Sequence, residues 1–192
     1  MMRRLLALPL VTVMLLVMPA AAQEPTPQPA GRKPRVSPPQ PQQPQGLDYF
    51  IGDWTFTWVG RESPITAGPR EGTLTYVRKG TSGMELRAEG TIDGGAAFRE
   101  TGTAEWNAGK KTMTWVERLS TGHELRSIGD WSSPIGIRAE SEPVKAGSQT
   151  IRVRRLYSIL SAQSYRVTEE ISVNGGPYQR LGDGRFQRNI KR

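Results

Sequence analysis

Short runs of residues between Leu47 and Arg192 alternate between apolar and polar side chains with a period of two. This alternation is typical of β-strands that bury one face and expose the other. Ten strands are predicted on this basis, at residues 54–59, 72–79, 84–92, 96–106, 112–119, 124–131, 135–142, 150–158, 165–173 and 178–188. Apart from one turn at residues 47–50, no segment has a helical period.

Glycine-rich turn sequences separate the predicted strands. Examples are Asp93–Gly95 and Asn174–Gly176, which supply the positive φ angles that tight hairpins require. Consecutive hairpins at even spacing predict an up-and-down meander, and closure into a barrel removes its two exposed edges. The sequence therefore predicts an all-β domain, an antiparallel up-and-down barrel of about ten strands.

One phase of the alternation is apolar and the other is rich in Thr, Arg and Glu, so the apolar phase is predicted to face the interior. The inward positions are Trp54, Phe56, Trp58, Leu74, Tyr76, Met84, Leu86, Ala88, Ile92, Phe98, Ala104, Trp106, Met113, Trp115, Leu119, Ile151, Val153, Tyr157, Tyr165, Val167, Ile171 and Val173. Five charged residues share this phase: Glu100, Glu117, Arg155, Glu169 and Arg180. Such charges must pair, lie near the mouth, or meet a ligand or water.

The N-terminal residues predict a cleavable signal peptide. Arg3 and Arg4 precede an apolar stretch at residues 5–18, and Ala20–Ala22 supplies the small residues for cleavage before Gln23. The stretch is shorter than the roughly 20 residues that cross a membrane, so no transmembrane anchor is expected after cleavage. We therefore expect residues 1–22 to direct export, to the periplasm or out of the cell, by the general secretory or the twin-arginine route.

A Pro- and Gln-rich segment at residues 23–46 precedes the predicted barrel domain at residues 47–192. Its lack of apolar residues predicts a disordered linker. The chain has no cysteine, which excludes disulfides and thiolate chemistry. The net charge is +8 for the whole chain and +6 after Arg3 and Arg4 are removed with the signal peptide, a modest excess that would assist contact with an anionic envelope surface. Export and the absence of a recognition motif argue against a nucleic-acid partner.

The start of the first predicted strand, Gly52–Trp54, resembles the opening of the calycin barrels, which include lipocalins, fatty-acid-binding proteins and nitrobindins. In that pattern the tryptophan plugs the closed end of the barrel, and a basic residue of the last strand packs on it. The resemblance implies this role for Trp54, with Gly52 beside it and Arg185 or Arg188 as the basic partner. Three segments together resemble an uncharacterised family of exported bacterial lipocalin-like domains of unknown function: residues 47–54, 101–117 and 178–188.

Several chemistries lack their residues. The sequence contains no GxSxG, P-loop or HExxH motif, and its single histidine, His123, rules out a multi-histidine metal site. His123 follows a turn, as a solvated residue would, although the nitrobindin resemblance also allows an axial haem ligand. The nitrobindin ligand lies close to the C-terminus, where this chain has no histidine. No metal and no cofactor, haem included, is therefore expected.

Arg155 and Tyr157 share a strand face and could fork onto a ligand carboxylate, as a similar interior pair does in fatty-acid-binding proteins. The alternative is an internal Glu–Arg network in a partly wet barrel. Trp54 is assigned to the core, whereas other tryptophans could form a pocket wall. The predicted ligand-binding set is Arg155, Tyr157, Arg180, Trp58, Trp106, Trp115 and Glu117.

Three functions remain open from the sequence. The favoured one is an exported binding module that holds a small hydrophobic or amphipathic molecule in the barrel cavity. The second is an enzyme of unknown chemistry that uses Glu100, Glu117 or Glu169 as general acid or base. The third is an envelope protein-interaction module with a filled barrel and an exposed apolar patch.

Overall fold

A computed structural model describes residues 46–190, in which eleven strands follow a short 3₁₀ turn, η1 (Leu47–Tyr49). The predicted signal peptide and residues 23–45 of the predicted linker lie outside the described residues. The strands are β1 (Gly52–Gly60), β2 (Arg70–Lys79), β3 (Gly83–Ile92), β4 (Ala97–Asn107), β5 (Thr112–Arg118), β6 (Glu124–Ser133), β7 (Gly136–Ser141), β8 (Val144–Ala146), β9 (Gln149–Ser161), β10 (Ser164–Val173) and β11 (Gln179–Arg188). Within residues 46–190 no helix is long and apolar enough to cross a membrane.

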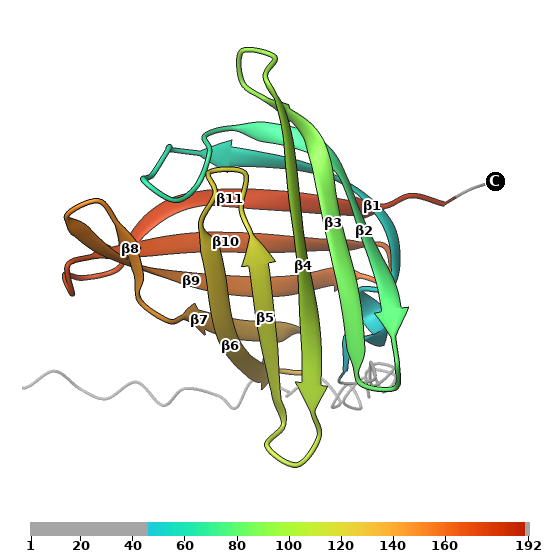
Figure 1. The fold of residues 1–192 in the computed structure, drawn as a ribbon. Helices are drawn as coiled ribbons and strands as arrows, with labels where there is room; N and C mark the ends of the chain where they lie inside the picture. Colours follow the sequence, from blue (N-terminus) through green and yellow to red (C-terminus); the bar gives the residue numbers. More distant parts are fainter. Residues whose placement is uncertain (1–45, 191–192) are drawn as a thin grey trace, which may run out of the picture. The chain divides into compact units, whose positions relative to one another are not determined.

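Ten of these strands close into an antiparallel barrel (Figure 1). From β1 to β7 each strand pairs with the next, β7 pairs with β9, and β10 and β11 follow. β11 then pairs with β1, with Trp54 opposite Arg188 near one end and Gly60 opposite Gly182 at the other. The predicted up-and-down barrel is therefore confirmed, and its first and last strands protect each other's edges.

β8 is a three-residue strand that the sequence does not predict. It pairs with the beginning of β9, where Val144 lies opposite Ile151. Three residues are too few to display a period of two, so the pattern gives no sign of it.

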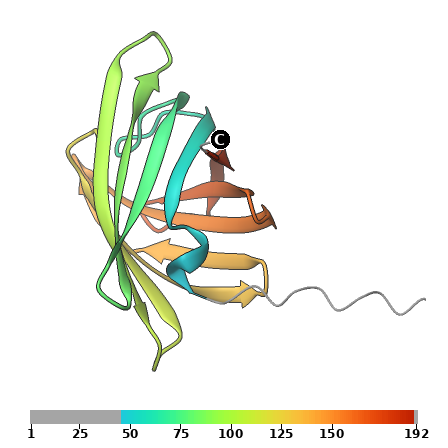
Figure 2. The ribbon, with the colours of Figure 1, turned by 90° about the vertical axis from the view of Figure 1, so that its right-hand side faces the viewer.

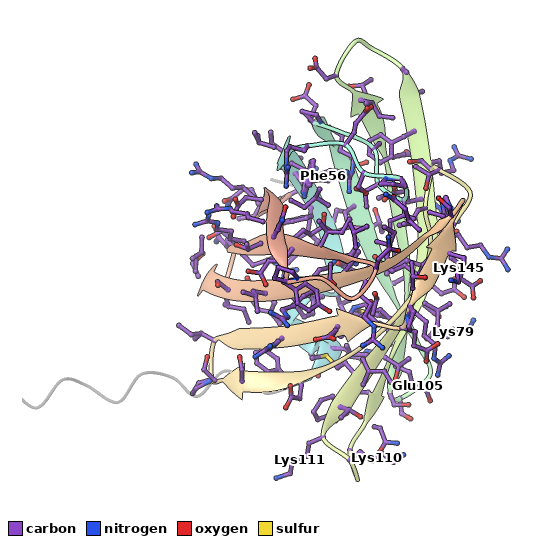
Figure 3. The ribbon with its side chains drawn as sticks, turned by 90° about the vertical axis from the view of Figure 1, so that its left-hand side faces the viewer. Phe56, Lys79, Glu105, Lys110, Lys111 and Lys145 are labelled. Carbon is purple, nitrogen blue, oxygen red and sulfur yellow. The ribbon has the colours of Figure 1, made fainter. Side chains whose placement is uncertain are left out.

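The apolar positions of the predicted inward phase form the core, with three exceptions. Ile92 and Trp106 are half-buried and Val173 is 37% exposed, because each lies at or next to the end of its strand. The other positions of this phase are buried, and Figure 3 shows Phe56 among the side chains inside the barrel. Inward residues of later strands extend the same core: Leu125, Ile137, Ala139, Ile159 and Leu181.

η1 lies directly before β1 and closes one end of the barrel (Figure 2). Trp54 has no exposed surface, and its Nε1 donates to the Phe50 carbonyl at 2.7 Å. The Arg188 guanidinium lies over the Trp54 ring, 4.2 Å from its centroid, and donates to the Ile51 carbonyl at 2.6 Å. Arg188 thus takes the position that the calycin resemblance implies, whereas Arg185 is exposed.

Gly52 allows this close approach. Its φ of +120° is a conformation that residues with a side chain rarely adopt, and a Cβ there would lie 3.0 Å from Arg188 Nη1. A side chain at this position would strain the backbone and disturb the guanidinium over Trp54.

The loop between β1 and β2, residues 61–69, folds over the opposite end. Ile65 has no exposed surface, and Thr121 of the β5–β6 turn donates its hydroxyl to the Ile65 carbonyl at 2.8 Å. A backbone bridge between Ser63 and Thr66 shapes this loop.

Candidate functional site

Three charged side chains meet inside the barrel. Arg155 donates from Nε to Glu169 Oε1 at 2.7 Å and from Nη1 to Glu117 Oε2. The register of β9 and β10 places Arg155 directly opposite Glu169, while Glu117 reaches it from β5. The side chains of Arg155, Glu169 and Glu117 are 10%, 3% and 14% exposed, respectively. Two carboxylates therefore share one guanidinium in a site that is largely shielded from water.

This cluster forms one wall of a partly open cavity of about 80 Å³. At about 30 Å³ for each water in the liquid, such a volume holds about three water molecules. It lies well below the roughly 300–1,000 Å³ of pockets for drug-sized ligands, so only a small molecule fits. Aromatic side chains make up much of the remaining lining: Phe56, Trp58, Tyr76, Tyr157, Tyr165 and Phe186.

Two side chains of the lining carry polar atoms without a hydrogen-bond partner in the described part of the chain: Glu169 Oε2 and Trp58 Nε1. Both atoms are shielded from bulk solvent. A buried polar group without a partner costs about 1–3 kcal/mol, and more when it is charged. One atom is an acceptor and the other a donor, so the lining residues carry one unmet hydrogen-bonding group of each kind.

Glycines hold Trp58 flat against the barrel wall. Cβ atoms added at Gly60 and Gly182 would each lie 2.5 Å from carbons of the indole, so the ring needs bare backbone at both positions. Arg70 lies over the ring, 4.7 Å from a ring centroid, and donates from Nη1 to the Ala67 carbonyl at 2.9 Å. Trp58 is thereby fixed as an aromatic surface of the cavity.

The predicted ligand-binding residues divide into those at the cavity and those elsewhere. Four of them line it: Trp58, Glu117, Arg155 and Tyr157. Trp115 lies behind this lining, with its ring stacked on that of Tyr157 at a centroid distance of 5.6 Å. Trp106 is half-buried near the end of β4 and does not line the cavity.

The predicted inward position of Arg180 is wrong. Its side chain is 61% exposed, and its Nε donates to Asp183 Oδ2 at 2.9 Å. A β-bulge explains this, because the pairing of β10 with β11 skips Leu181 between Glu169 and Glu170. Leu181 is buried instead, so the inward and outward phases exchange at this point.

Other residues of the cavity lining were not predicted to bind a ligand, and Glu169 was predicted only as a candidate general acid or base. Arg70 precedes the predicted strand at residues 72–79 and belongs to no pattern that marks it. Tyr76 and Tyr165 are predicted as inward residues, but only as core. The sequence marks Glu169 as an inward carboxylate, and its position on the same face as Tyr165, four residues away, is the signal that could have linked them.

The cluster shifts the pKa values of its members. Burial raises the pKa of Glu117 above its usual value, although the Arg155 charge opposes the shift. Burial would lower the pKa of Arg155, but the carboxylates of Glu117 and Glu169 outweigh this effect and raise it. Burial also raises the pKa of Tyr76 to about 12. Arg155 is therefore charged and the Tyr76 phenol neutral at physiological pH.

Replacing Glu117 with glutamine is expected to remove a loss of stability at rising pH. The folded protein holds the Glu117 proton more tightly than the unfolded chain does, so it loses stability as the pH rises from the usual carboxyl pKa through the raised one. Glutamine cannot ionise, yet it keeps an acceptor for Arg155. Urea unfolding at about pH 4 and about pH 7 should show Glu117→Gln gaining on the wild type. A difference that is the same at both pH values would contradict the raised pKa.

The remaining candidate centres lie outside the cavity. His123 lies in the β5–β6 turn, with Nδ1 3.1 Å from Thr121 Oγ1, and does not line the cavity. A space of about 80 Å³ is too small for a porphyrin. Within residues 46–190, no group of three or more His, Asp or Glu side chains is placed to hold a metal ion.

The outer surface offers more diffuse features. Lys110 and Lys111 project from the tip of the β4–β5 hairpin (Figure 3). An open depression of about 740 Å³ is lined by polar residues of the outer face, such as Thr55 and Thr73, together with a few aromatic side chains. Exposed large apolar side chains occur on separate strands: Val59, Val77, Ile128 and Leu160. In the described part of the chain, the interior cavity is thus the pocket that has buried charged side chains in its wall.

Comparison with known proteins finds similarity in structure only. No protein-family model matches the sequence, and a search of curated proteins gives no match. The barrel is similar to the crystal structure of Rv2717c from M. tuberculosis, at 15% identity and a TM-score of 0.59, covering 77% of this chain and 99% of that one. It also matches the redesigned β-barrel mFAP1 bound to DFHBI, at 14% identity and a TM-score of 0.43, covering 75% of this chain and 99% of that one. At such identities the likeness to Rv2717c shows the fold alone.

Proposed function

We propose that the barrel is an exported binding module that holds one small amphipathic molecule in its interior cavity. The observation that carries the proposal is the pair of unpartnered buried atoms, Glu169 Oε2 and Trp58 Nε1, on residues that line one cavity. The pattern of residues 1–22 supports export, so the ligand is met in the periplasm or outside the cell.

The contrast between the two ends of the barrel supports a binding role. At the η1 end, Phe50 and Trp54 pack against Tyr165 with ring centroids 5.4 and 4.8 Å away. Buried ion pairs are often no more stabilising than apolar residues of similar volume. A barrel that only presented its outer surface could be filled in this apolar way throughout. The buried charges beside the cavity are therefore better explained by binding than by stability.

The geometry changes the choice of polar anchors. Arg155 already binds Glu117 and Glu169, so it is not free to clamp a ligand carboxylate together with Tyr157. Glu169 and Trp58 take this place as acceptor and donor, and the Tyr157 ring forms part of the wall.

Native mass spectrometry of the full exported protein, purified without unfolding, is expected to show a small bound molecule that is lost on denaturation. Glu169→Gln should weaken its retention about tenfold or more, because hydrogen bonds to charged groups contribute about 1.5–3 kcal/mol. Glu170→Gln is the matched control, because Glu170 is the next residue of β10 and does not line the cavity. Its carboxylate forms an ion pair with Arg154 at a distance of 3.3 Å.

The control variant should retain the molecule as well as the wild type does. A protein that carries no bound molecule and gains none from a panel of small ions and neutral compounds would contradict the proposed function.

A further inference from the structure

The charges that line the cavity are unequal, and this imbalance bears on the chemistry of the ligand. Three carboxylates line it, those of Glu100, Glu117 and Glu169, against two guanidinium groups, those of Arg70 and Arg155. With all five groups ionised, the lining carries one excess negative charge. A positively charged ligand would neutralise it.

Each guanidinium in the lining already has acceptors within the described residues. Arg155 donates to two carboxylates, and Arg70 donates to the Ala67 carbonyl while it lies over the Trp58 ring. Glu169 Oε2, by contrast, has no partner in the described part of the chain. Glu169 Oε2 therefore lacks a donor, and a ligand with positively charged N–H groups supplies one.

The aromatic lining favours the same charge. The faces of Trp and Tyr rings carry negative potential and attract cations within about 6 Å of the ring centroid. Trp58, Tyr76, Tyr157 and Tyr165 all line the cavity, and Arg70 already lies over Trp58 at 4.7 Å. Aromatic rings also pack against the carbon atoms of an organic cation and remove these atoms from water.

We infer that the cavity binds a small organic ammonium ion, with its N–H groups toward Glu169 and its carbon atoms against the aromatic rings. This inference rests on the proposed function and names its ligand class. The volume of about 80 Å³ limits the ion to a few heavy atoms, such as a short alkylammonium, and leaves no room for a lipid chain. The ammonium balances the excess charge of the Glu117–Arg155–Glu169 cluster.

Three probes of nearly equal size separate charge from shape: propylammonium, propan-1-ol and propionate. Each is titrated into the ¹⁵N-labelled full exported protein at matched ionic strength, and the Trp58 indole N–H resonance, assigned with Trp58→Phe, reports binding. Propylammonium is expected to shift this resonance saturably and to bind about tenfold or more tightly than propan-1-ol, because hydrogen bonds to a charged partner are the stronger ones. Propionate is expected to leave it unchanged. Binding of propylammonium should weaken about tenfold in Glu169→Gln and stay unchanged in Glu170→Gln.

The outcomes distinguish a failure of the ammonium inference from a failure of the proposed binding function. Equal or tighter binding of propan-1-ol or propionate at the Trp58 resonance would overturn the ammonium class and leave a binding cavity. A Trp58 resonance that responds to none of the three probes, together with a protein free of any bound molecule in native mass spectrometry, would overturn both. The comparison of probes uses the wild type, so it decides the question even if the Glu169 variant fails to fold.

Discussion

Replacing Arg155 with methionine is expected to lower the free energy of unfolding by about 3–5 kcal/mol at neutral pH. Arg155 is the shared partner of Glu117 and Glu169, and its side chain is only 10% exposed. Its removal leaves two carboxylates close together without a cation, in a site that water hardly reaches. Urea unfolding measures the loss, and the loss should shrink toward acidic pH because protonation removes the uncompensated negative charge.

Two comparison variants make this test specific. Arg152 lies on the same strand, is 49% exposed and pairs with Glu140 at 3.5 Å. Arg152→Met should therefore lower the free energy of unfolding by less than about 1 kcal/mol. Adding Glu117→Gln and Glu169→Gln to Arg155→Met should recover most of the loss, since a cluster replaced as a whole leaves no buried charge. An Arg155 variant that is as stable as the Arg152 variant would disprove the buried cluster.

Replacing Trp54 with alanine is expected to lower the free energy of unfolding by about 3–5 kcal/mol, the range for removing a fully buried large aromatic side chain. Trp54 has no exposed surface and packs against Tyr165 with ring centroids 4.8 Å apart. Its loss would also leave Arg188 without the ring it covers and Phe50 without the donor to its carbonyl. Thermal and urea unfolding should both report the change.

Trp106→Ala is the matched control, because Trp106 is only half-buried near the end of β4. It should lose clearly less stability than Trp54→Ala. A milder change, Trp54→Phe, keeps a ring but loses the Nε1–H bond to Phe50, so its effect should lie between the two alanine variants. Equal losses for Trp54→Ala and Trp106→Ala would show that η1 and Trp54 do not close the barrel as described.

These two residues represent different uses of the same interior. Trp54 belongs to the apolar end, where residues of η1 pack into the core and Arg188 lies over the Trp54 ring. Arg155 belongs to the charged region, where an arginine and two glutamates border a small cavity. The first arrangement gives the barrel its stability, and the second gives it a site that differs chemically from the rest of the core.

The strands and their faces could be predicted because they depend on short-range alternation. A residue and the one two positions later point to the same side of a sheet, so Trp54, Phe56 and Trp58 share a face whatever the rest of the fold does. The same rule places Arg155 and Tyr157 together, and both line the cavity. The rule fails where the ladder is irregular. One skipped residue, Leu181, was enough to turn Arg180 outward.

By itself, the sequence determined an up-and-down antiparallel barrel, its inward phase and the presence of charges within that phase. The calycin resemblance implied that the partner of Trp54 is one of two arginines of the last strand. Only the tertiary structure decided that Arg155 meets both Glu169, 14 residues away, and Glu117, 38 residues away. Contacts across a closed barrel depend on the register of every strand between them, which a period of two does not encode. The cavity size and the unpartnered oxygen of Glu169 depend in turn on how side chains from opposite walls pack.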